Sequence, residues 1–162
     1  MKKLISHRFR LKNKHNSSNQ LKFGKHGAYR PKEYTRNMSE MTKLFMELDF
    51  DIPEKTPLGV KINYYYPRPK SGTYYPITRH TKDLDSTKGV NDALMTAGKQ
   101  LIKKRNKDAE KIYPMYDDSQ IITEVLNKYY WEEEYYGLDL IVVAIEPDDS
   151  VELELSKMKV EE

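Results

Sequence analysis

The sequence has no cysteine among its 162 residues, so disulfide bonds and thiolate metal ligands are excluded. No long apolar run follows the basic start, because Leu4 and Ile5 give way at once to Ser6 and His7, so a signal-peptide core is missing. A glycine-rich phosphate loop is also absent, which argues against a nucleotide-binding α/β domain. We therefore expect a cytoplasmic protein that binds no organic cofactor and enters no membrane.

Acidic residues are missing from the first part of the chain, where Glu33 is the first to occur. Beyond Trp131 the balance inverts and acids dominate, although the net charge of the whole chain is only +3. A basic segment is attracted to polyanions because each neutralised phosphate releases counterions. We expect it to contact nucleic acid and the acidic end to face away; the alternative is a solvated tail. The basic residues of this segment are Lys2, Lys3, Arg8, Arg10, Lys12, Lys14, Lys22, Lys25, Arg30 and Lys32.

Length and composition indicate one globular domain with a charged surface. Hydrophobic residues make up 38% and charged residues 33% of a chain that is long enough for one core. We divide it into a basic strand and loop segment at 1–31, a core at 32–146 and an acidic tail at 147–162.

Hydrophobic spacing predicts alternating helices and strands. A helix is expected over 32–48 and another after Asp85, where Val90, Leu94, Ala97 and Leu101 share one face. Residues 99–111 are dense in charge and fit either a continued helix or an exposed excursion. Strands are expected at 8–11, 60–66, 119–131 and 138–145. The fold class is therefore α+β, with a sheet packed by helices.

Two acidic signals stand out in this basic chain, namely Asp83 with Asp85, and Asp118 next to Asp117. Two aspartates separated by one residue project to the same side of an extended backbone, so they can share a hard cation such as Mg²⁺ with a third carboxylate. Lys88 follows within three residues and is suited to stabilise charge on a transferring phosphate. The alternatives are a helix N-cap for Asp85 and an ordinary surface position for Lys88.

The order of these residues resembles the RusA family of Holliday junction resolvases. The resemblance runs from about Val60 to Ile145 and rests on the successive motifs Asp83-Leu84-Asp85, Asn91-Asp92-Ala93-Leu94 and Asp117-Asp118-Ser119-Gln120. It implies a small mixed α+β fold and a homodimeric endonuclease of phage or prophage type. It also implies Mg²⁺, for which Mn²⁺ can substitute, held by Asp83, Asp85 and Asp118, with Lys88 as the catalytic lysine.

The chain departs from the family pattern at three points. Ser86 stands where the family usually has Asn, and Lys88 comes one residue early, which indicates a one-residue deletion after Asp85. The spacer from Gly98 to Tyr116 is longer than is common in the family, and the basic N-terminal segment is extended.

Further candidate contacts lie outside the carboxylate set. Phosphate contact is expected for four basic residues that flank the motif, with plain solubility as the alternative: Arg68, Lys70, Arg79 and Lys82. Five tyrosines either stack on unpaired bases or pack in the sheet: Tyr64, Tyr65, Tyr66, Tyr74 and Tyr75. His7, His15 and His26 are expected at the surface instead of in a zinc site. His80, near the acidic pair, is expected as a plain loop histidine, with phosphate contact as the alternative.

The sequence thus favours a Mg²⁺-dependent endodeoxyribonuclease that resolves Holliday junctions or other branched DNA by paired phosphodiester hydrolysis, acting in a bacterial cell or a phage-infected host. The main alternative is a non-catalytic basic DNA-binding protein, in which the acidic residues serve only as caps and turns. A DxD glycosyltransferase is a weaker third possibility, because the chain leaves little room for a nucleotide-binding domain.

Overall fold

The structure is a computed structural model that describes residues 1–15, 22–29, 32–77, 88–105, 117–147 and 151–161. Its strands are β1 (Lys2–Leu11), β2 (Lys22–Gly24), β3 (Gly27–Tyr29), β4 (Leu58–Pro67), β5 (Ile121–Trp131) and β6 (Tyr136–Ala144). Its helices are α1 (Lys32–Glu47), α2 (Lys88–Arg105) and α3 (Val151–Lys157), together with a single 3₁₀ turn, η1 (Asp118–Gln120).

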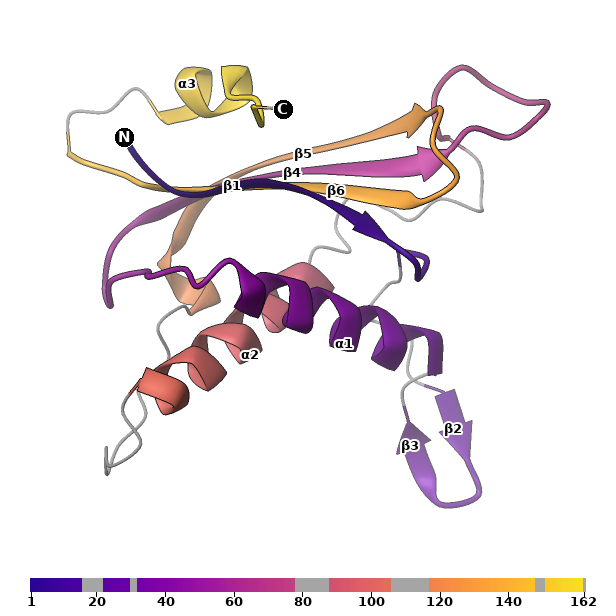
Figure 1. Ribbon diagram of the computed structural model, residues 1–162, viewed down its shortest axis with the longest axis horizontal. Helices are drawn as coiled ribbons and strands as arrows, with labels where there is room; N and C mark the ends of the chain where they lie inside the picture. The colour runs from indigo at the N-terminus through magenta and orange to yellow at the C-terminus, as the bar shows by residue number, and fades with distance from the viewer. Residues whose placement is uncertain (16–21, 30–31, 78–87, 106–116, 148–150, 162) are drawn as a thin grey trace.

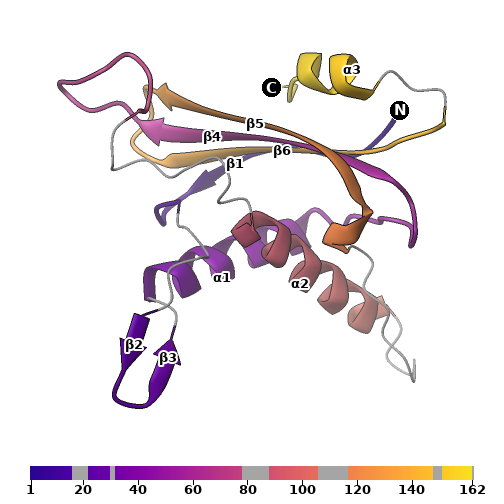
Figure 2. The same ribbon diagram turned by 180° about the vertical axis from the view of Figure 1, so that it is seen from behind.

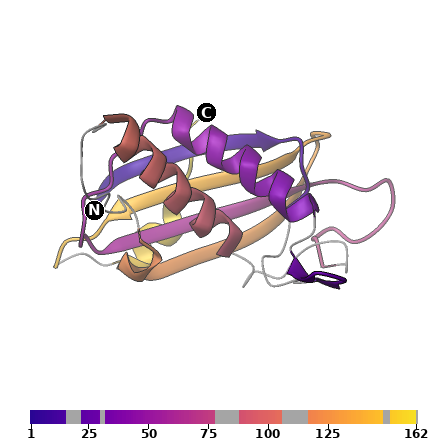
Figure 3. The same ribbon diagram turned by 90° about the horizontal axis from the view of Figure 1, so that it is seen from below.

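Four strands form one mixed sheet in the order β1-β6-β4-β5. β6 runs antiparallel to both of its neighbours, whereas β4 and β5 are parallel, with α2 in the connection between them. Helices α1 and α2 lie side by side on one face of the sheet, and α3 lies on the other (Figures 1, 2 and 3). The expected α+β class with a mixed sheet packed by helices is confirmed.

The main core lies between the sheet and helices α1 and α2. On α2, the four residues whose spacing predicted this helix are all buried, and from α1 the side chains of Met41 and Phe45 reach the same layer. Strand β4 contributes Ile62 and β6 contributes Leu138 and Leu140, all of which are buried. Both helices are therefore stabilised by the burial of their apolar faces against the same face of the sheet.

The opposite face of the sheet is covered in part by α3, which the sequence had assigned to an acidic tail. Leu155 packs against Ile141 and Val143 in a second, smaller core cluster. Lys61 on β4 is also buried, and its Nζ donates to the backbone oxygens of Ser156 at 2.7 Å and Met158 at 2.8 Å. A buried lysine is therefore satisfied by carbonyls that the end of a helix leaves unpaired.

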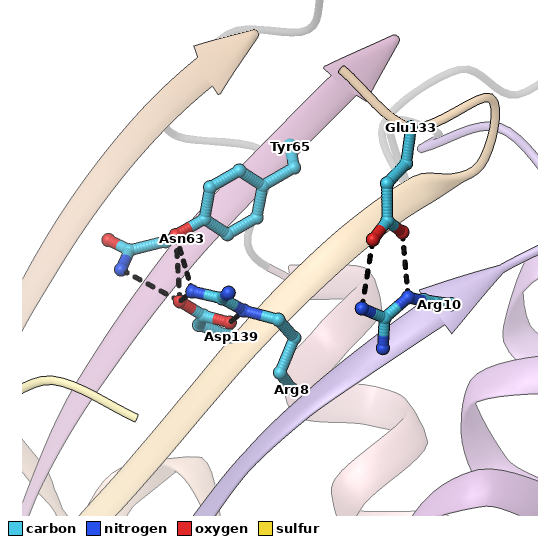
Figure 4. A network of polar contacts seen from close by, with 6 residues as sticks. All are labelled: Arg8, Arg10, Asn63, Tyr65, Glu133 and Asp139. Atoms are coloured by element: carbon cyan, nitrogen blue, oxygen red, sulfur yellow. Dashed lines mark hydrogen bonds and ion pairs between the residues drawn. The ribbon is translucent and has the colours of Figure 1, made fainter. Parts of the chain in front are cut away.

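Beyond α3 this face carries a polar network centred on Asp139 (Figure 4). The Asp139 carboxylate accepts hydrogen bonds from Arg8 Nε at 2.7 Å, from the Tyr65 hydroxyl at 2.8 Å and from Asn63 Nδ2 at 3.3 Å. This explains why β4 is buried on both faces, although alternation had predicted a half-buried strand. Burial and hydrogen bonding to Asp139 raise the pKa of Tyr65 to about 12.

His15 is buried, so its expected surface position is wrong, whereas His7 and His26 are exposed as expected. The Nε2 atom of His15 lies 3.0 Å from the backbone oxygen of Tyr65, and three tyrosine rings surround the His15 imidazole. Loss of water around the ring lowers the pKa of His15 to about 4. The ring therefore acts as a neutral core side chain.

Candidate active site

Asp118 stands in η1, a single turn that is fixed at both ends by side chains. The Asp117 carboxylate accepts a hydrogen bond from the backbone N–H of Ser119 at 3.0 Å, and the Gln120 side-chain oxygen accepts one from the N–H of Asp117 at 2.9 Å. Gln120 Nε2 also donates to two backbone oxygens of the 53–56 turn. Asp117 is thus used as an N-cap, and its hydrogen bond with the backbone N–H of Ser119 lowers its pKa. Asp118, the neighbouring carboxylate, is exposed.

A β-bulge at the start of β5 determines which way its first side chains point. The pairing with β4 shifts between Leu58 and Gly59, which leaves Ile122 as an extra residue in β5. Ile121 and Leu126 both pack against the helix-side core although they are an odd number of residues apart, which a regular strand does not allow. The bulge therefore sets Glu124 on the helix side of the sheet, together with Leu126.

Asp118 and Glu124 line one pocket with Asn91 of α2. The pocket measures about 380 Å³ and is completed by the beginning of β5. Asn91 Nδ2 donates to Glu124 Oε1 at 3.4 Å, so the first turn of α2 is joined to the sheet at this point. The carboxylates of Asp118 and Glu124 are hard oxygen donors, which suit Mg²⁺ and not a soft thiophilic metal.

The structure shows where some of the predicted site residues lie and leaves others outside the described residues. Asp83 and Asp85 fall outside them, as do His80, Arg79 and Lys82. Lys88 is the first residue of α2, so it lies one turn before Asn91, and only its backbone is described. Asp118 and the start of the helix that carries Lys88 are therefore brought to the same pocket.

Sequence reasoning did not include Glu124 among the candidates. Leu126 and Tyr130 lie on the same face of β5 and pack against the core, but Lys128 lies between them on that face, so Glu124 does not stand out in the sequence as a lone charge. Strict alternation counted from Ile121 also sends Glu124 to the other face. Only the bulge shows that it belongs to the pocket.

The basic residues before the motif are exposed, and one of them is already engaged. Arg68 Nε pairs with Glu132 Oε1 at 2.6 Å, and its guanidinium lies over the rings of Tyr74 and Tyr130. Lys70 is exposed in the same loop. Both side chains are accessible to a phosphate group, but Arg68 must break or share its ion pair with Glu132 to bind one.

The candidate stacking tyrosines separate into buried and exposed groups. Tyr64 and Tyr66 are buried on the helix side of β4, so they pack in the core and do not present a face to a base. Tyr65 is half-buried and stacks between Tyr129 and Trp131. Tyr74 and Tyr75 are exposed by 73% and 60%, although their rings contact each other and Arg68 lies over the Tyr74 ring, so these two of the five offer the most ring surface to a base.

Within the described part of the chain, no three His, Asp or Glu side chains gather closely enough to hold a metal ion, and no helix is long and apolar enough to cross a membrane. The absence of a three-residue cluster takes no account of Asp83 and Asp85, the two expected partners of Asp118, because they lie outside the described residues. No family model matches the sequence, and no curated protein is similar enough to it to indicate kinship.

Proposed function

We propose that this protein is a Mg²⁺-dependent endodeoxyribonuclease that hydrolyses phosphodiesters at branched DNA, with the four-way junction as its principal substrate. The observation that carries the proposal is the pocket shared by Asp118, Glu124 and Asn91. It brings the carboxylate of the last motif to the start of the helix that directly follows the first motif.

Chain length supports the same grouping of carboxylates. Asp85 precedes Lys88 by three residues, and three residues span at most about 11 Å. The covalent chain therefore keeps Asp85 within reach of the end of α2 that borders the pocket, and five residues, or at most about 18 Å, separate Asp83 from Lys88. In the proposal Asp83, Asp85 and Asp118 hold the ion, and Glu124 supports them from the strand.

The roles of the residues follow from their charges. When bound, Mg²⁺ polarises the scissile phosphate and makes an attacking water more acidic. The Lys88 side chain carries a positive charge at neutral pH. Its role in the proposal is to stabilise the negative charge that develops on the phosphate, not to donate a proton. Arg68, Lys70, Arg79 and Lys82 bind backbone phosphates next to the cut strand.

A homodimer is part of the proposal because a four-way junction is resolved by two coordinated cuts. Two identical sites related by a two-fold axis match the symmetry of such a junction. We place the activity in the cytoplasm of a bacterial cell or a phage-infected host, where branched DNA arises during recombination and repair.

The test is a cleavage assay on an end-labelled four-way junction, with Mg²⁺ and with EDTA. The wild-type protein nicks the junction only with Mg²⁺, and Asp118→Asn abolishes nicking but still shifts the junction in a gel, because the basic surface is unchanged. Asp117→Asn is the matched control and retains activity, since asparagine is an equally good N-cap. A wild-type protein that shifts the junction but never nicks it with Mg²⁺ is instead a DNA-binding protein.

A further inference from the structure

The short hairpin formed by β2 and β3 stands apart from the sheet. It projects from the body of the molecule beyond α1, on the same side of the sheet as α1 and α2, as both views in Figures 1 and 2 show. Among the described residues its strands pair only with each other, and every residue from Phe23 to Tyr29 is exposed. An isolated two-stranded hairpin is only marginally stable in water, and the side chains from Phe23 to Tyr29 add nothing to the buried core.

The hairpin closes with a tight turn that places a lysine and a histidine at its tip. Gly24 pairs with Gly27, so Lys25 and His26 occupy the turn. Gly27 has φ +104°, a conformation that side chains rarely adopt. The tip is therefore both narrow and basic, and it lies in a segment of 32 residues without a single acid.

The two aromatic residues of the hairpin have different roles. The Tyr29 ring covers Gly24, because a Cβ built on Gly24 would lie 2.9 Å from Tyr29 Cε1. Tyr29 thus packs across the strand pair and helps to hold it together. Phe23 pairs with Ala28, so it lies on the other face of the hairpin and is 83% exposed. It has no ring contact within the described structure, and no fold-stabilising role explains it.

We propose that the hairpin is a DNA-contacting arm in which Phe23 stacks on an unpaired base at the branch point while the basic tip contacts backbone phosphates. This inference rests on the proposed function and names the part of the molecule that distinguishes branched from ordinary DNA. An exposed phenyl ring with a lysine nearby matches the two features of an unpaired nucleotide, a flat apolar base and a charged backbone. In a regular duplex the bases are stacked on one another, so Phe23 has no partner there.

The position of the hairpin also supports branched DNA as its ligand. Glu124 and Asn91 set the candidate pocket on the helix side of the sheet, and the hairpin projects on that side. Charge complementarity favours DNA, because Lys25 lies at the tip of the hairpin within a segment of 32 residues that has no acid, and such a segment is attracted to a polyanion. A strand bound at the pocket and a base held by the arm can thus belong to one branched molecule.

The test compares binding to a four-way junction and to a duplex of equal length, in EDTA so that no cleavage occurs. Phe23→Ala weakens binding to the junction about tenfold and changes duplex binding less than twofold. Phe23→Trp keeps the junction affinity of the wild type, because it retains an aromatic ring. Lys25→Glu weakens binding to both the junction and the duplex. Tyr135→Ala, which removes another exposed aromatic side chain in the β5–β6 loop, is the matched control and leaves both affinities unchanged.

A fluorescent base at the branch point gives an independent readout. 2-Aminopurine is quenched by its neighbours in the DNA stack, so wild-type protein changes its emission and Phe23→Ala does not. Circular dichroism and the unfolding midpoint of Phe23→Ala match the wild type, since the side chain is outside the core.

Three results overturn the inference: unchanged junction affinity in Phe23→Ala, an equal loss of affinity for junction and duplex, or a change in sedimentation that shows Phe23 to be a contact between protein subunits. Failure of the arm and failure of the nuclease proposal are separable. A protein that nicks junctions with Mg²⁺ but ignores Phe23→Ala refutes only the arm. A protein whose junction binding depends on Phe23 but that never nicks refutes only the nuclease.

Discussion

Arg8 and Asp139 are joined directly across the neighbouring strands β1 and β6 by an ion pair with two hydrogen bonds. Arg8 Nε lies 2.7 Å from Asp139 Oδ1, and Nη2 lies 3.1 Å from Oδ2. The side chain of Asp139 is only 3% exposed and that of Arg8 23%, so the pair is largely removed from water. Asp139 also has its hydrogen bonds from Tyr65 and Asn63, which makes it the centre of the network in Figure 4.

Arg8→Met is therefore expected to lower the free energy of unfolding by about 2–3 kcal/mol, because it leaves a buried carboxylate without its cation. Urea denaturation followed by circular dichroism measures this. Arg10→Met is the matched control on the same strand. Arg10 pairs with Glu133 at 2.6 Å, but both side chains are well exposed, so its loss changes the free energy by less than about 1 kcal/mol. Equal effects in the two variants would show that Asp139 gains nothing from its burial with Arg8.

The elements that could be predicted from the sequence are those whose apolar faces repeat over several turns or strand positions. Helix α2 was predicted from four residues, and all four are buried at 3% or less. Strand β6 was predicted from its continuous apolar run, and β1 from a short piece, although it extends over ten residues. Periodicity works for α2 because its four apolar residues contact the same core, whereas β6 is a continuous apolar run because its two faces pack against different core clusters.

Three features could not be predicted because they depend on contacts far apart in the sequence. Helix α3 has seven residues, which is too short for a recognisable period, and is held by Lys61 and Leu155. His15 looked like a surface residue until three tyrosine rings enclosed it. For the site, motif order selected Asp118, but the bulge that adds Glu124 to the pocket leaves no mark in the sequence.

Glu124→Gln is expected to raise the Mg²⁺ concentration needed for half-maximal junction cleavage about tenfold, since it removes one negative charge beside Asp118 and keeps the shape of the side chain. The measurement is a titration of cleavage rate against Mg²⁺ at a fixed DNA concentration. Glu134→Gln, an exposed carboxylate in the β5–β6 loop, is the control and leaves the curve in place. Superimposable curves for Glu124→Gln and the wild type would exclude Glu124 from the metal site.

His15 is expected to make the protein less stable in mildly acidic solution. Burial lowers its pKa from an unfolded value of 6.5 to about 4, so the folded state disfavours the proton that the unfolded chain accepts. This contribution to stability is fully present above pH 6.5 and is lost as the pH falls towards 4, by about 3 kcal/mol in total. His15→Gln keeps an N–H donor for the Tyr65 oxygen but cannot titrate, so its free energy of unfolding falls less between pH 7 and pH 4 than that of the wild type. Urea denaturation at a series of pH values compares the two slopes, with the exposed His7→Gln as control. Parallel curves of unfolding free energy against pH for the wild type and His15→Gln would contradict this prediction. They would mean that the folded protein accepts a proton on His15 without loss of stability.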